Sequence, residues 1–465
     1  MTASTSLGSR LSGGLPANYW RLWTASASSN LADGIFWIAF PLLAVRLTDS
    51  PVLIAGVAVV GRLPWLVFVL FAGALADRLD RRRTMIGVSV LRIAISGLIA
   101  LTIVTATDQL WMLYVAAFAL GVGETLFDTA AQSVMPSVVE RDDLAKANGR
   151  LYAVELTMNQ FVGPPVGGLL AGLAIALAFA GSALAFAIAA LALASLAGSF
   201  KPVRDETKKT SIVADIREGL SYLFHHKVLR TLAIMVGIGN LANTAAFAIF
   251  VLYAVEPGPM GLDELGYGVL LTTMAIGSLA GSLVVERIEK RLGRSRLLLV
   301  SAVMLSLTIA VPGLTTNAWL VGISFAISGL GVVLWNVVTV SLRQRIVPDA
   351  LLGRLNASYR LLAWGSQPIG AVMGGLIGEW IGLEAVFLIA GFGSAALLLP
   401  LGLYVTDARI AAAEREGEAE REQLAAEAVV DPLPGDAVTA PGPASPDAAD
   451  VTDADAPQDE PAPTR

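Results

Sequence analysis

The sequence predicts an all-α polytopic membrane protein with twelve transmembrane helices in two pseudo-symmetric six-helix bundles. Three observations lead to this fold class. Of the 465 residues, 55% are hydrophobic and only 15% are charged, a composition far more apolar than that of a soluble globular domain. Apolar stretches of about 20 residues, the length that crosses a ~30 Å hydrocarbon core, recur along most of the chain. Lys and Arg residues are concentrated in alternate connections between these stretches.

The expected spans form two sets of six. The first set lies at 20–47, 52–76, 85–106, 110–135, 150–177 and 180–199, and the second at 229–255, 266–285, 297–314, 318–341, 357–381 and 384–405. The bundles therefore occupy 20–199 and 229–405. A short cytoplasmic N-terminus (1–19), a cytoplasmic central loop (200–228) and an acidic, disordered cytoplasmic tail (406–465) complete the expected organisation.

The distribution of basic residues gives the expected topology. The connections near 77–83, 141–150, 201–230, 287–296 and 343–360 hold 23 of the 28 Lys and Arg residues that precede residue 407. Because cytoplasmic loops retain positive charge, both termini are expected to be cytoplasmic. The net charge of −6 comes from the tail, where 15 acidic side chains outnumber 4 basic ones. The first part of the tail, 407–430, has helical composition and is expected to extend the last membrane helix as a solvated rod.

The two halves resemble each other in sequence. Residues 139–148 align with 347–356, and each segment leads from the fourth span of its half into the fifth. Small residues then recur every four positions, as Gly163, Gly167 and Ala171 in one half and as Gly370, Gly374 and Gly378 in the other. Such spacing allows close helix contact. Parallel repeats place a substrate site at their interface near mid-membrane.

Composition also excludes several function classes. The chain has no cysteine, so disulfides, thiolate metal sites and cysteine nucleophiles are ruled out. Its two histidines, His225 and His226, lie in the basic central loop and supply too little for a metal centre. No phosphate-binding loop motif is present, which argues against an ATP-driven pump. We therefore expect no metal, no cofactor and no enzymatic activity, while a non-transporting membrane receptor or scaffold stays open.

Residues 73–83 form a short charged run between two spans. Gly73 permits close backbone approach, Asp77 lies where a helix ends, and Arg78 and Arg81 belong to the basic cluster that follows. The alternative interpretation of this run is an ordinary loop that keeps its positive charge on the cytoplasmic side. The spacing of this run, with twelve spans and a longer central loop, resembles the major facilitator superfamily over about residues 18–405. The superfamily usually has Gly where this chain has Asp80.

Further segments resemble one branch of that superfamily, the macrolide-efflux and enterobactin-exporter-like group. They are Asn30-Leu-Ala-Asp33-Gly34, Arg62-Leu-Pro64-Trp65 and Glu124-Thr-Leu-Phe-Asp128. The resemblance implies that Gly73, Asp77, Arg78 and Arg81 form a conformational latch. In it, Asp77 would face the N-terminus of the span at 357–381, because helix N-termini attract anions.

A second motif lies in the span at 150–177. Residues Gly163, Pro164, Gly167 and Gly168 are similar to the antiporter motif that marks exporters in this superfamily, although Asn159 stands where that motif usually has another Gly. The motif implies a kinked, closely packed helix. A plain proline kink is the alternative, and because the match is partial, import and uniport stay open.

Charged residues inside the spans are candidates for proton coupling, since a charge at mid-bilayer costs about 2.5–3.5 kcal/mol on insertion scales. Asp33 lies about 13 residues into its span, roughly 20 Å of rise, and Arg62 reaches a similar depth from the opposite side. The two are expected to pair, either as a permanent structural ion pair or as a pair that protonation of Asp33 breaks.

Glu124 and Asp128 stack on one helical face, and their repulsion favours proton uptake. For Asp128 we favour a structural pair with Arg92 or with an arginine of 78–83 over proton coupling. For Glu124 a structural role and a role in proton coupling are equally favoured.

Polar and aromatic side chains at middle depth are candidates for substrate binding, although any single one is more often a packing contact. They are Asn30, Trp37, Asn240, Asn243, Trp335, Asn336, Trp364 and Gln367. We therefore expect a monomeric secondary transporter of a bacterial inner membrane, with a small-molecule substrate, protons and membrane lipid as partners and no nucleic acid. The expected activity is proton-coupled efflux of a hydrophobic or amphipathic compound, such as a drug, by alternating access. Export of an endogenous metabolite or siderophore stays open.

Overall fold

The computed structural model describes residues 15–67, 80–140, 143–198 and 212–430, and the regular elements in these ranges are helices. Residues up to Glu418 belong to one compact unit, which contains everything discussed below. The N-terminal half comprises α2 (Ala17–Leu47), α3 (Pro51–Val67), α5 (Arg81–Val104), α6 (Leu110–Val138), α7 (Leu144–Leu156), η2 (Thr157–Val162), α8 (Gly163–Leu173) and α9 (Ile175–Ala194). The C-terminal half comprises α10 (Ile212–His225), α11 (Lys227–Ala254), α12 (Glu264–Leu292), α13 (Arg294–Ala310), η3 (Val311–Gly313), α14 (Ala318–Ile346), α15 (Asp349–Trp380), α16 (Leu383–Ala395) and α17 (Leu398–Tyr404), and α18 (Asp407–Val430) follows.

Nine helical stretches in the described ranges are long and apolar enough to cross a membrane. They are Ala17–Leu47, Arg81–Val104, Leu110–Ala131, Ile175–Ala194, Lys227–Ala254, Glu264–Leu292, Arg294–Gly313, Ala318–Ile346 and Leu383–Tyr404. The expected spans at 52–76, 150–177 and 357–381 are helical over 52–67, 150–173 and 357–380, but they are not among the nine. The span at 52–76 falls short of the required length because α3 is described only as far as Val67.

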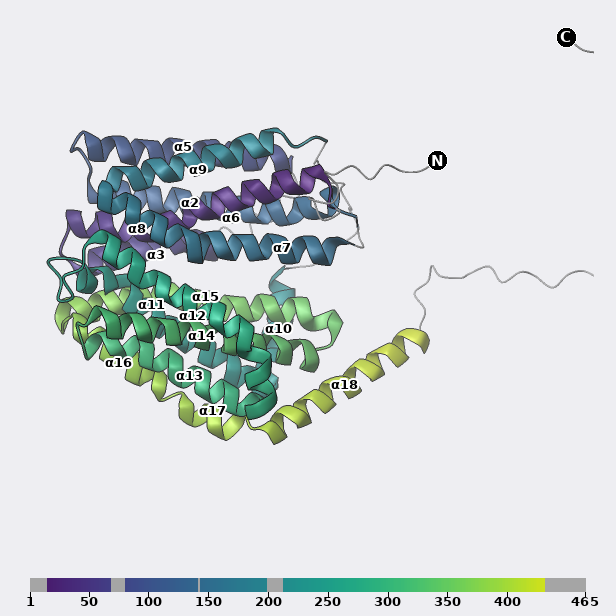
Figure 1. Ribbon diagram of the computed structural model, residues 1–465. Helices are drawn as coiled ribbons and strands as arrows, with labels where there is room; N and C mark the ends of the chain where they lie inside the picture. The colour runs from purple at the N-terminus through teal and green to yellow at the C-terminus, as the bar shows by residue number, and fades with distance from the viewer. Residues whose placement is uncertain (1–14, 68–79, 141–142, 199–211, 431–465) are drawn as a thin grey trace, which may run out of the picture. The chain divides into compact units, whose positions relative to one another are not determined.

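In the N-terminal half, α2 packs against α8 and α9, α9 also packs against α5, and α6 packs against α3 and α5 (Figure 1). Aromatic rings join α2 to α9: Phe36 lies 5.8 Å from Phe179 and 5.8 Å from Phe186 between ring centroids. Because α9 is rich in alanine, its backbone can approach its neighbours closely while the phenylalanines fill the remaining space.

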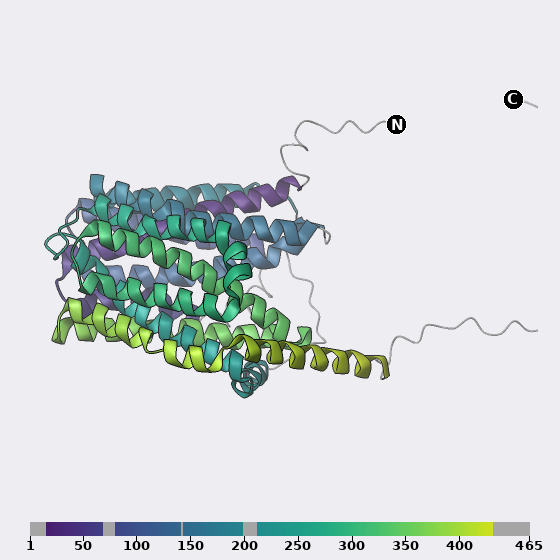
Figure 2. The same cartoon turned by 60° about the horizontal axis from the view of Figure 1, so that its bottom comes forward.

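In the C-terminal half, α11 packs against α15 and α16, as α2 packs against α8 and α9, and α14 packs against both α12 and α13. Figure 2 shows the helices of this half, coloured from teal to yellow, from a second side. Gly370 and Gly374 of α15 lie directly against the α11 backbone, and Gly163 and Gly167 of α8 lie directly against the α2 backbone. The glycine spacing predicted from the sequence therefore marks close helix contacts in both halves.

The two halves meet chiefly through α3 with α15 and α8 with α12. The central loop also contains a helix that was not predicted, α10, which packs against α15 and α11. Glu218 of α10 accepts a hydrogen bond from Arg354 of α15 at 2.8 Å.

The helix predicted at 407–430 is present as α18. It is separate from α17, which ends at Tyr404. Asp407 accepts a hydrogen bond from the backbone N–H of Ser295 at 3.0 Å, and Glu414 pairs with Arg294, so the start of α18 is held against α13.

Candidate functional site

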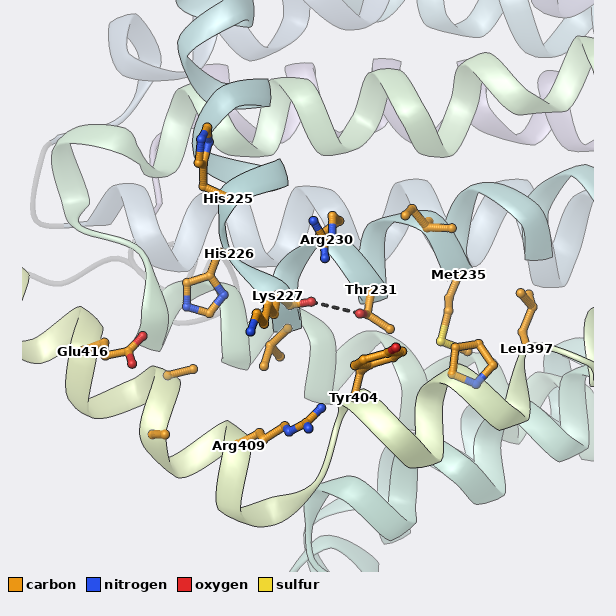
Figure 3. Close-up of a pocket in the computed structure, with 15 residues that line it drawn as sticks. His225, His226, Lys227, Arg230, Thr231, Met235, Leu397, Tyr404, Arg409 and Glu416 are labelled. Carbon is orange, nitrogen blue, oxygen red and sulfur yellow. Dashed lines mark hydrogen bonds between the residues drawn. The ribbon is translucent and has the colours of Figure 1, made fainter.

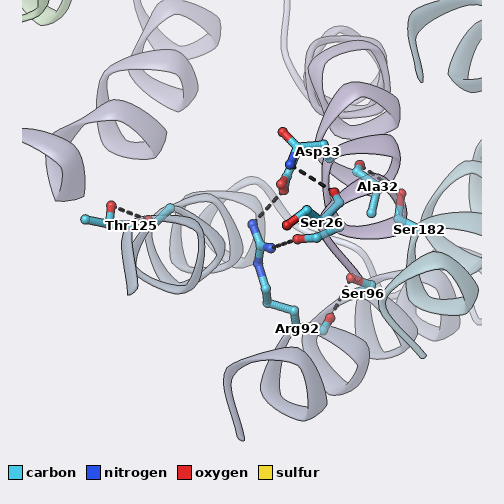
Figure 4. A network of polar contacts seen from close by, with 10 residues as sticks. Ser26, Ala32, Asp33, Arg92, Ser96, Thr125 and Ser182 are labelled. Carbon is cyan, nitrogen blue, oxygen red and sulfur yellow. Dashed lines mark hydrogen bonds and ion pairs between the residues drawn. The ribbon is translucent and has the colours of Figure 1, made fainter. Parts of the chain in front are cut away.

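A buried ion pair joins α2 to α5. Arg92 Nη2 donates to Asp33 Oδ1 at 2.6 Å, and Arg92 Nη1 donates to the Ser29 hydroxyl at 2.9 Å (Figure 4). The Arg92 side chain is 1% exposed and that of Asp33 is 9% exposed. Removing two charges from water is costly, so a buried pair of this kind is favourable only when its geometry is good and its remaining donors are satisfied.

The surroundings of Arg92 are built to admit its long side chain. The guanidinium carbon lies 4.3 Å from the centroid of the Phe186 ring, and Gly123 of α6 leaves room on the other side, since a Cβ there would lie 3.1 Å from Arg92 atoms. Arg92 Nε is buried and has no hydrogen-bond partner among the described residues. The pair is therefore well aligned but incompletely satisfied.

The expected pairing of Asp33 with Arg62 is not found, because Asp33 pairs with Arg92. The Arg62 guanidinium instead lies 4.3 Å from the centroid of the Trp37 ring. Arg62 still interacts electrostatically with both Asp33 and Glu124. Helical periodicity did not predict the direction in which α3 presents its arginine. Among the described residues Asp128 interacts electrostatically with Arg92 but forms no ion pair with it. The alternative pairing of Asp128 with an arginine of 78–83 stays a prediction.

Four carboxylates are linked by electrostatic interactions in this half. Glu124 interacts with Asp33 and with Asp128, and Asp128 in turn interacts with Glu155 of α7. Sequence reasoning missed Glu155, although an acidic residue inside the apolar span at 150–177 was a usable signal. The structure therefore brings the predicted residues Asp33, Arg62, Glu124 and Asp128 together and adds Arg92 and Glu155 to them.

The antiporter-like motif lies where three helices meet. A Cβ on Gly163 would lie 2.5 Å from the Cα of Gly34 in α2, and one on Gly168 would lie 2.8 Å from the Cα of Gly268 in α12. Gly167 faces α2 beside Ile35. One face of α8 is thus pressed against its own half and the other against the opposite half.

The chain entering this motif is irregular. Residues Thr157–Val162 form the π-helical turn η2, and Gly163 donates its N–H to the Met158 carbonyl. Pro164 and Pro165 follow at the start of α8 and have no N–H to donate to the preceding turn. The backbone of this span is therefore irregular just before the two prolines, as a π-turn, and the predicted kink stays a prediction.

Among the described residues, two polar side-chain contacts between the halves lie at the same end of the helices. The Ser50 hydroxyl donates to Glu379 Oε2 at 2.7 Å, and Arg46 pairs with Glu264 at 2.7 Å. Deeper along α3, the rings of Trp65 and Trp364 meet edge to face with centroids 5.4 Å apart.

The remaining predicted substrate residues have different environments. Trp335 is 8% exposed and packs in the hydrophobic core of the C-terminal half. Asn240 donates to the Ala363 carbonyl at 2.7 Å and Asn30 donates to the Ser26 carbonyl at 3.0 Å. Trp37 and Trp364 are 49% and 43% exposed. Asn336 is exposed, and Asn243 and Gln367 are half-buried.

Of the predicted latch, Gly73, Asp77 and Arg78 lie outside the described residues. Arg81 is described and begins α5, where Asp80 caps the helix by accepting the Arg83 N–H at 3.1 Å. The latch therefore stays a prediction.

Comparison with known proteins agrees with this architecture. The profile of a family described as transmembrane secretion effector, a group within the major facilitator superfamily, matches residues 16–436. The chain belongs to this family. The family resemblance drawn from the sequence is thereby confirmed.

Similar curated proteins include efflux proteins. The chain is 28% identical over 396 residues to the multidrug efflux pump Tap of Mycolicibacterium fortuitum, covering 81% of this chain and 91% of the relative. It is 24% identical over 387 residues to macrolide efflux protein A of Streptococcus pyogenes, covering 80% and 92%. The family and these relatives are membrane transporters.

Solved structures support the fold. The nucleoside transporter NupG is similar with a TM-score of 0.64 and 13% identity, over 84% of this chain and 99% of that one. An autoinhibited peptide transporter of the POT family is similar with a TM-score of 0.67 and 12% identity, over 84% and 97%. At these identities the likeness concerns the fold alone. The chain is a multi-pass membrane protein with a transporter fold.

Proposed function

We propose that this chain is a proton-coupled exporter of hydrophobic or amphipathic small molecules that works by alternating access. The observation that carries the proposal is the buried Asp33–Arg92 pair, whose Arg92 Nε lacks a partner among the described residues. A purely structural ion pair is more stable when all its hydrogen-bond donors have partners. A pair that must open when Asp33 takes up a proton opens at a lower free-energy cost when one donor has no partner.

The neighbouring carboxylates provide a route for that proton. Glu124 interacts with Asp33, and Asp128 interacts with both Glu124 and Glu155, which lies at the C-terminal end of α7. Like charges held close together share protons readily, because protonating one relieves the repulsion on the next. We propose that the proton passes along this series and that Arg92 turns toward Asp128 when Asp33 is neutral.

Alternating access is supported by where the halves touch. Ser50, Arg46 and their partners lie at the end of α2 that leads into α3, which is the external end if the Lys- and Arg-rich connections are cytoplasmic. We therefore propose that this arrangement is closed to the exterior and faces the cytoplasm. The predicted Asp77 latch would act at the opposite end and would engage when the exterior opens.

The twelve-span topology belongs to the same proposal. We propose that three further segments cross the membrane beside the nine helices identified above: α3, the consecutive elements α7, η2 and α8, and α15. Both termini then lie in the cytoplasm of a bacterial cell. The matched glycine contacts of α8 with α2 and of α15 with α11 support two related halves. The efflux activity of the relatives supports an amphipathic drug-like substrate.

The test is uptake of ethidium and of a macrolide into everted membrane vesicles. Wild-type vesicles energised to an acid interior should accumulate substrate and release it when nigericin collapses the proton gradient. Asp33→Asn should abolish this accumulation but retain exchange of preloaded substrate without a gradient, which shows that the variant is folded. The control is Asp49→Asn, an exposed carboxylate, and it should behave as wild type. Accumulation that persists after the gradient is collapsed would contradict proton coupling.

A further inference from the structure

A pocket of about 680 Å³ lies between the start of α11 and the helices α17 and α18 (Figure 3). It lies away from the Asp33–Arg92 pair, among residues that the proposed transport mechanism does not use. Its volume falls within the range of small-molecule sites, about 300–1,000 Å³. The pocket belongs to the end of the C-terminal half that carries the basic connections, including His225, His226 and Lys227.

One part of the pocket is cationic. Lys227, Arg230 and Arg409 line it, and among the described residues none of the three forms an ion pair with a carboxylate. Arg230 donates to the Phe224 carbonyl at 3.3 Å and Arg409 donates to the Leu403 carbonyl at 2.8 Å. Each guanidinium has five N–H donors, so most remain available to a ligand.

The geometry directs two of these charges toward one space. Lys227 and Arg409 point toward the pocket from opposite walls, one from α11 and the other from α18 (Figure 3). The first turn of α11 contains no acidic residue, so the positive end of its helix dipole is not neutralised within that turn. Glu416 is the acidic residue of the lining, and it lies at the end of the pocket near His226. The lining therefore favours an anion.

The other part of the pocket is apolar. Ile234, Leu397 and Pro400 line it. Ile234 is 43% exposed, and Leu399 and Leu403 of the neighbouring helix α17 are 70% and 55% exposed, so apolar surface is available to lipid here. Tyr404 lies between the apolar and cationic parts, as aromatic residues do at membrane interfaces. A free anion in water would use only the cationic part, whereas an amphiphile would use both.

We propose that this pocket binds the headgroup of an anionic phospholipid from the leaflet on the Lys- and Arg-rich side. The phosphate lies between Lys227 and Arg409, Arg230 adds a further donor, and an acyl chain runs along Ile234 and Leu397. The proposal rests on the chain's being a membrane protein and not on the direction or coupling of transport. Its chemistry is that of basic pockets that recognise anionic lipid headgroups between membrane helices.

Bound lipid would connect parts of the chain that are distant in sequence. Lys227 begins α11, which is packed along α15, and Arg409 lies in α18, whose Glu414 pairs with Arg294. An anion between them would neutralise the mutual repulsion of the two cations and hold the start of α11 near the start of α18. The lipid would thus stabilise the C-terminal half.

The test is calorimetric titration of the detergent-solubilised full chain with dioctanoyl phosphatidylglycerol. Lys227→Gln and Arg409→Gln should each weaken binding roughly fivefold, as expected for the loss of one basic residue near an anionic headgroup. Arg409→Lys should restore most of the loss, and this conservative variant separates lost charge from misfolding. The control is Arg287→Gln, an exposed basic residue among the connections on the same side, and it should bind as wild type.

Two further titrants decide the source of the anion. Dioctanoyl phosphatidylcholine should bind at least tenfold more weakly, and inorganic phosphate should bind too weakly to measure at the same concentrations. Equal binding of phosphatidylcholine would overturn the assignment, as would phosphate binding as tightly as the lipid. Unchanged affinity in both Lys227→Gln and Arg409→Gln would show that the lipid does not bind in this pocket.

Discussion

Glu379, in the last turn of α15, accepts a hydrogen bond from the Ser50 hydroxyl at 2.7 Å, immediately before α3 begins. The backbone N–H of Val52, in the first turn of α3, approaches the same carboxylate oxygen at 3.5 Å. A carboxylate from one half therefore lies at the positive end of a helix from the other half, where negative charge is favoured. If the Lys- and Arg-rich connections are cytoplasmic, this contact lies at the external end and is the counterpart of the latch predicted for Asp77 at the opposite end.

Replacing Glu379 should favour the outward-open state. Glu379→Gln removes the charge that interacts with the start of α3, and helix-terminus interactions of this kind contribute about 0.3–1 kcal/mol. Because the chain has no cysteine, spin labels can be placed at Thr107 and Leu314, exposed residues near the ends of α5 and α13. Pulsed electron resonance should show a larger fraction of long distances in Glu379→Gln. An unchanged distribution would mean that this contact does not hold the exterior closed.

The contact between α2 and α8 should not tolerate a methyl group. Gly34→Ala or Gly163→Ala would place a Cβ about 2.5 Å from backbone atoms of the facing segment, and overpacking typically costs about 1–3 kcal/mol. Both variants should lower the thermal unfolding temperature in detergent. Gly97→Ala in α5 is the matched control, since nothing lies within 4 Å of its Cβ position, and it should be neutral or slightly stabilising. Equal stability of all three would contradict the close packing.

The Asp33–Arg92 pair should show strong energetic coupling. Arg92→Gln leaves a buried carboxylate without its cation, and removing one partner of a buried pair costs about 3–5 kcal/mol. The double variant Asp33→Asn with Arg92→Gln should recover much of that stability, because no unpaired charge is left. It should still fail to accumulate substrate in vesicles. Recovery of both stability and accumulation would show that the pair has only a structural role.

Glu155 should affect the rate of coupled transport more than substrate binding. Glu155→Gln removes the carboxylate that interacts with Asp128, so the proposed proton route is interrupted on the side of α7. Proton release on addition of substrate to vesicles should slow several-fold, while the affinity for ethidium stays within twofold of wild type. Glu140→Gln, an exposed position just after α6, is the control. Normal proton release in Glu155→Gln would remove this residue from the route.

Most of the fold follows from the sequence, because hydrophobic length and loop charge act through simple physical constraints. The expected span at 110–135 corresponds to α6, and the one at 318–341 corresponds to α14, within a few residues at each end. α10 was missed because it lies in a polar stretch, where an amphipathic helix gives a much weaker signal than a membrane span.

The candidate site was less predictable than the fold. Depth in the membrane follows from counting residues, so Asp33, Arg62 and Glu124 could be selected as a group. The partner of Asp33 depends on how α2, α3 and α5 are rotated about their axes, and that rotation is fixed by contacts such as Phe186 with Arg92. The rotation of a helix relative to its neighbours therefore cannot be predicted from the residues of that helix alone.

The crossing of α8 and α12 has a mechanical consequence. At Gly168 and Gly268 the two backbones approach without side chains between them, so at this point there are no interlocked ridges and grooves to separate. Two smooth cylinders in contact can roll over one another while the crossing itself stays closed. Large displacements at the helix ends would then need only a small rotation here, and the crossing would act as a pivot that remains sealed to solutes throughout the cycle.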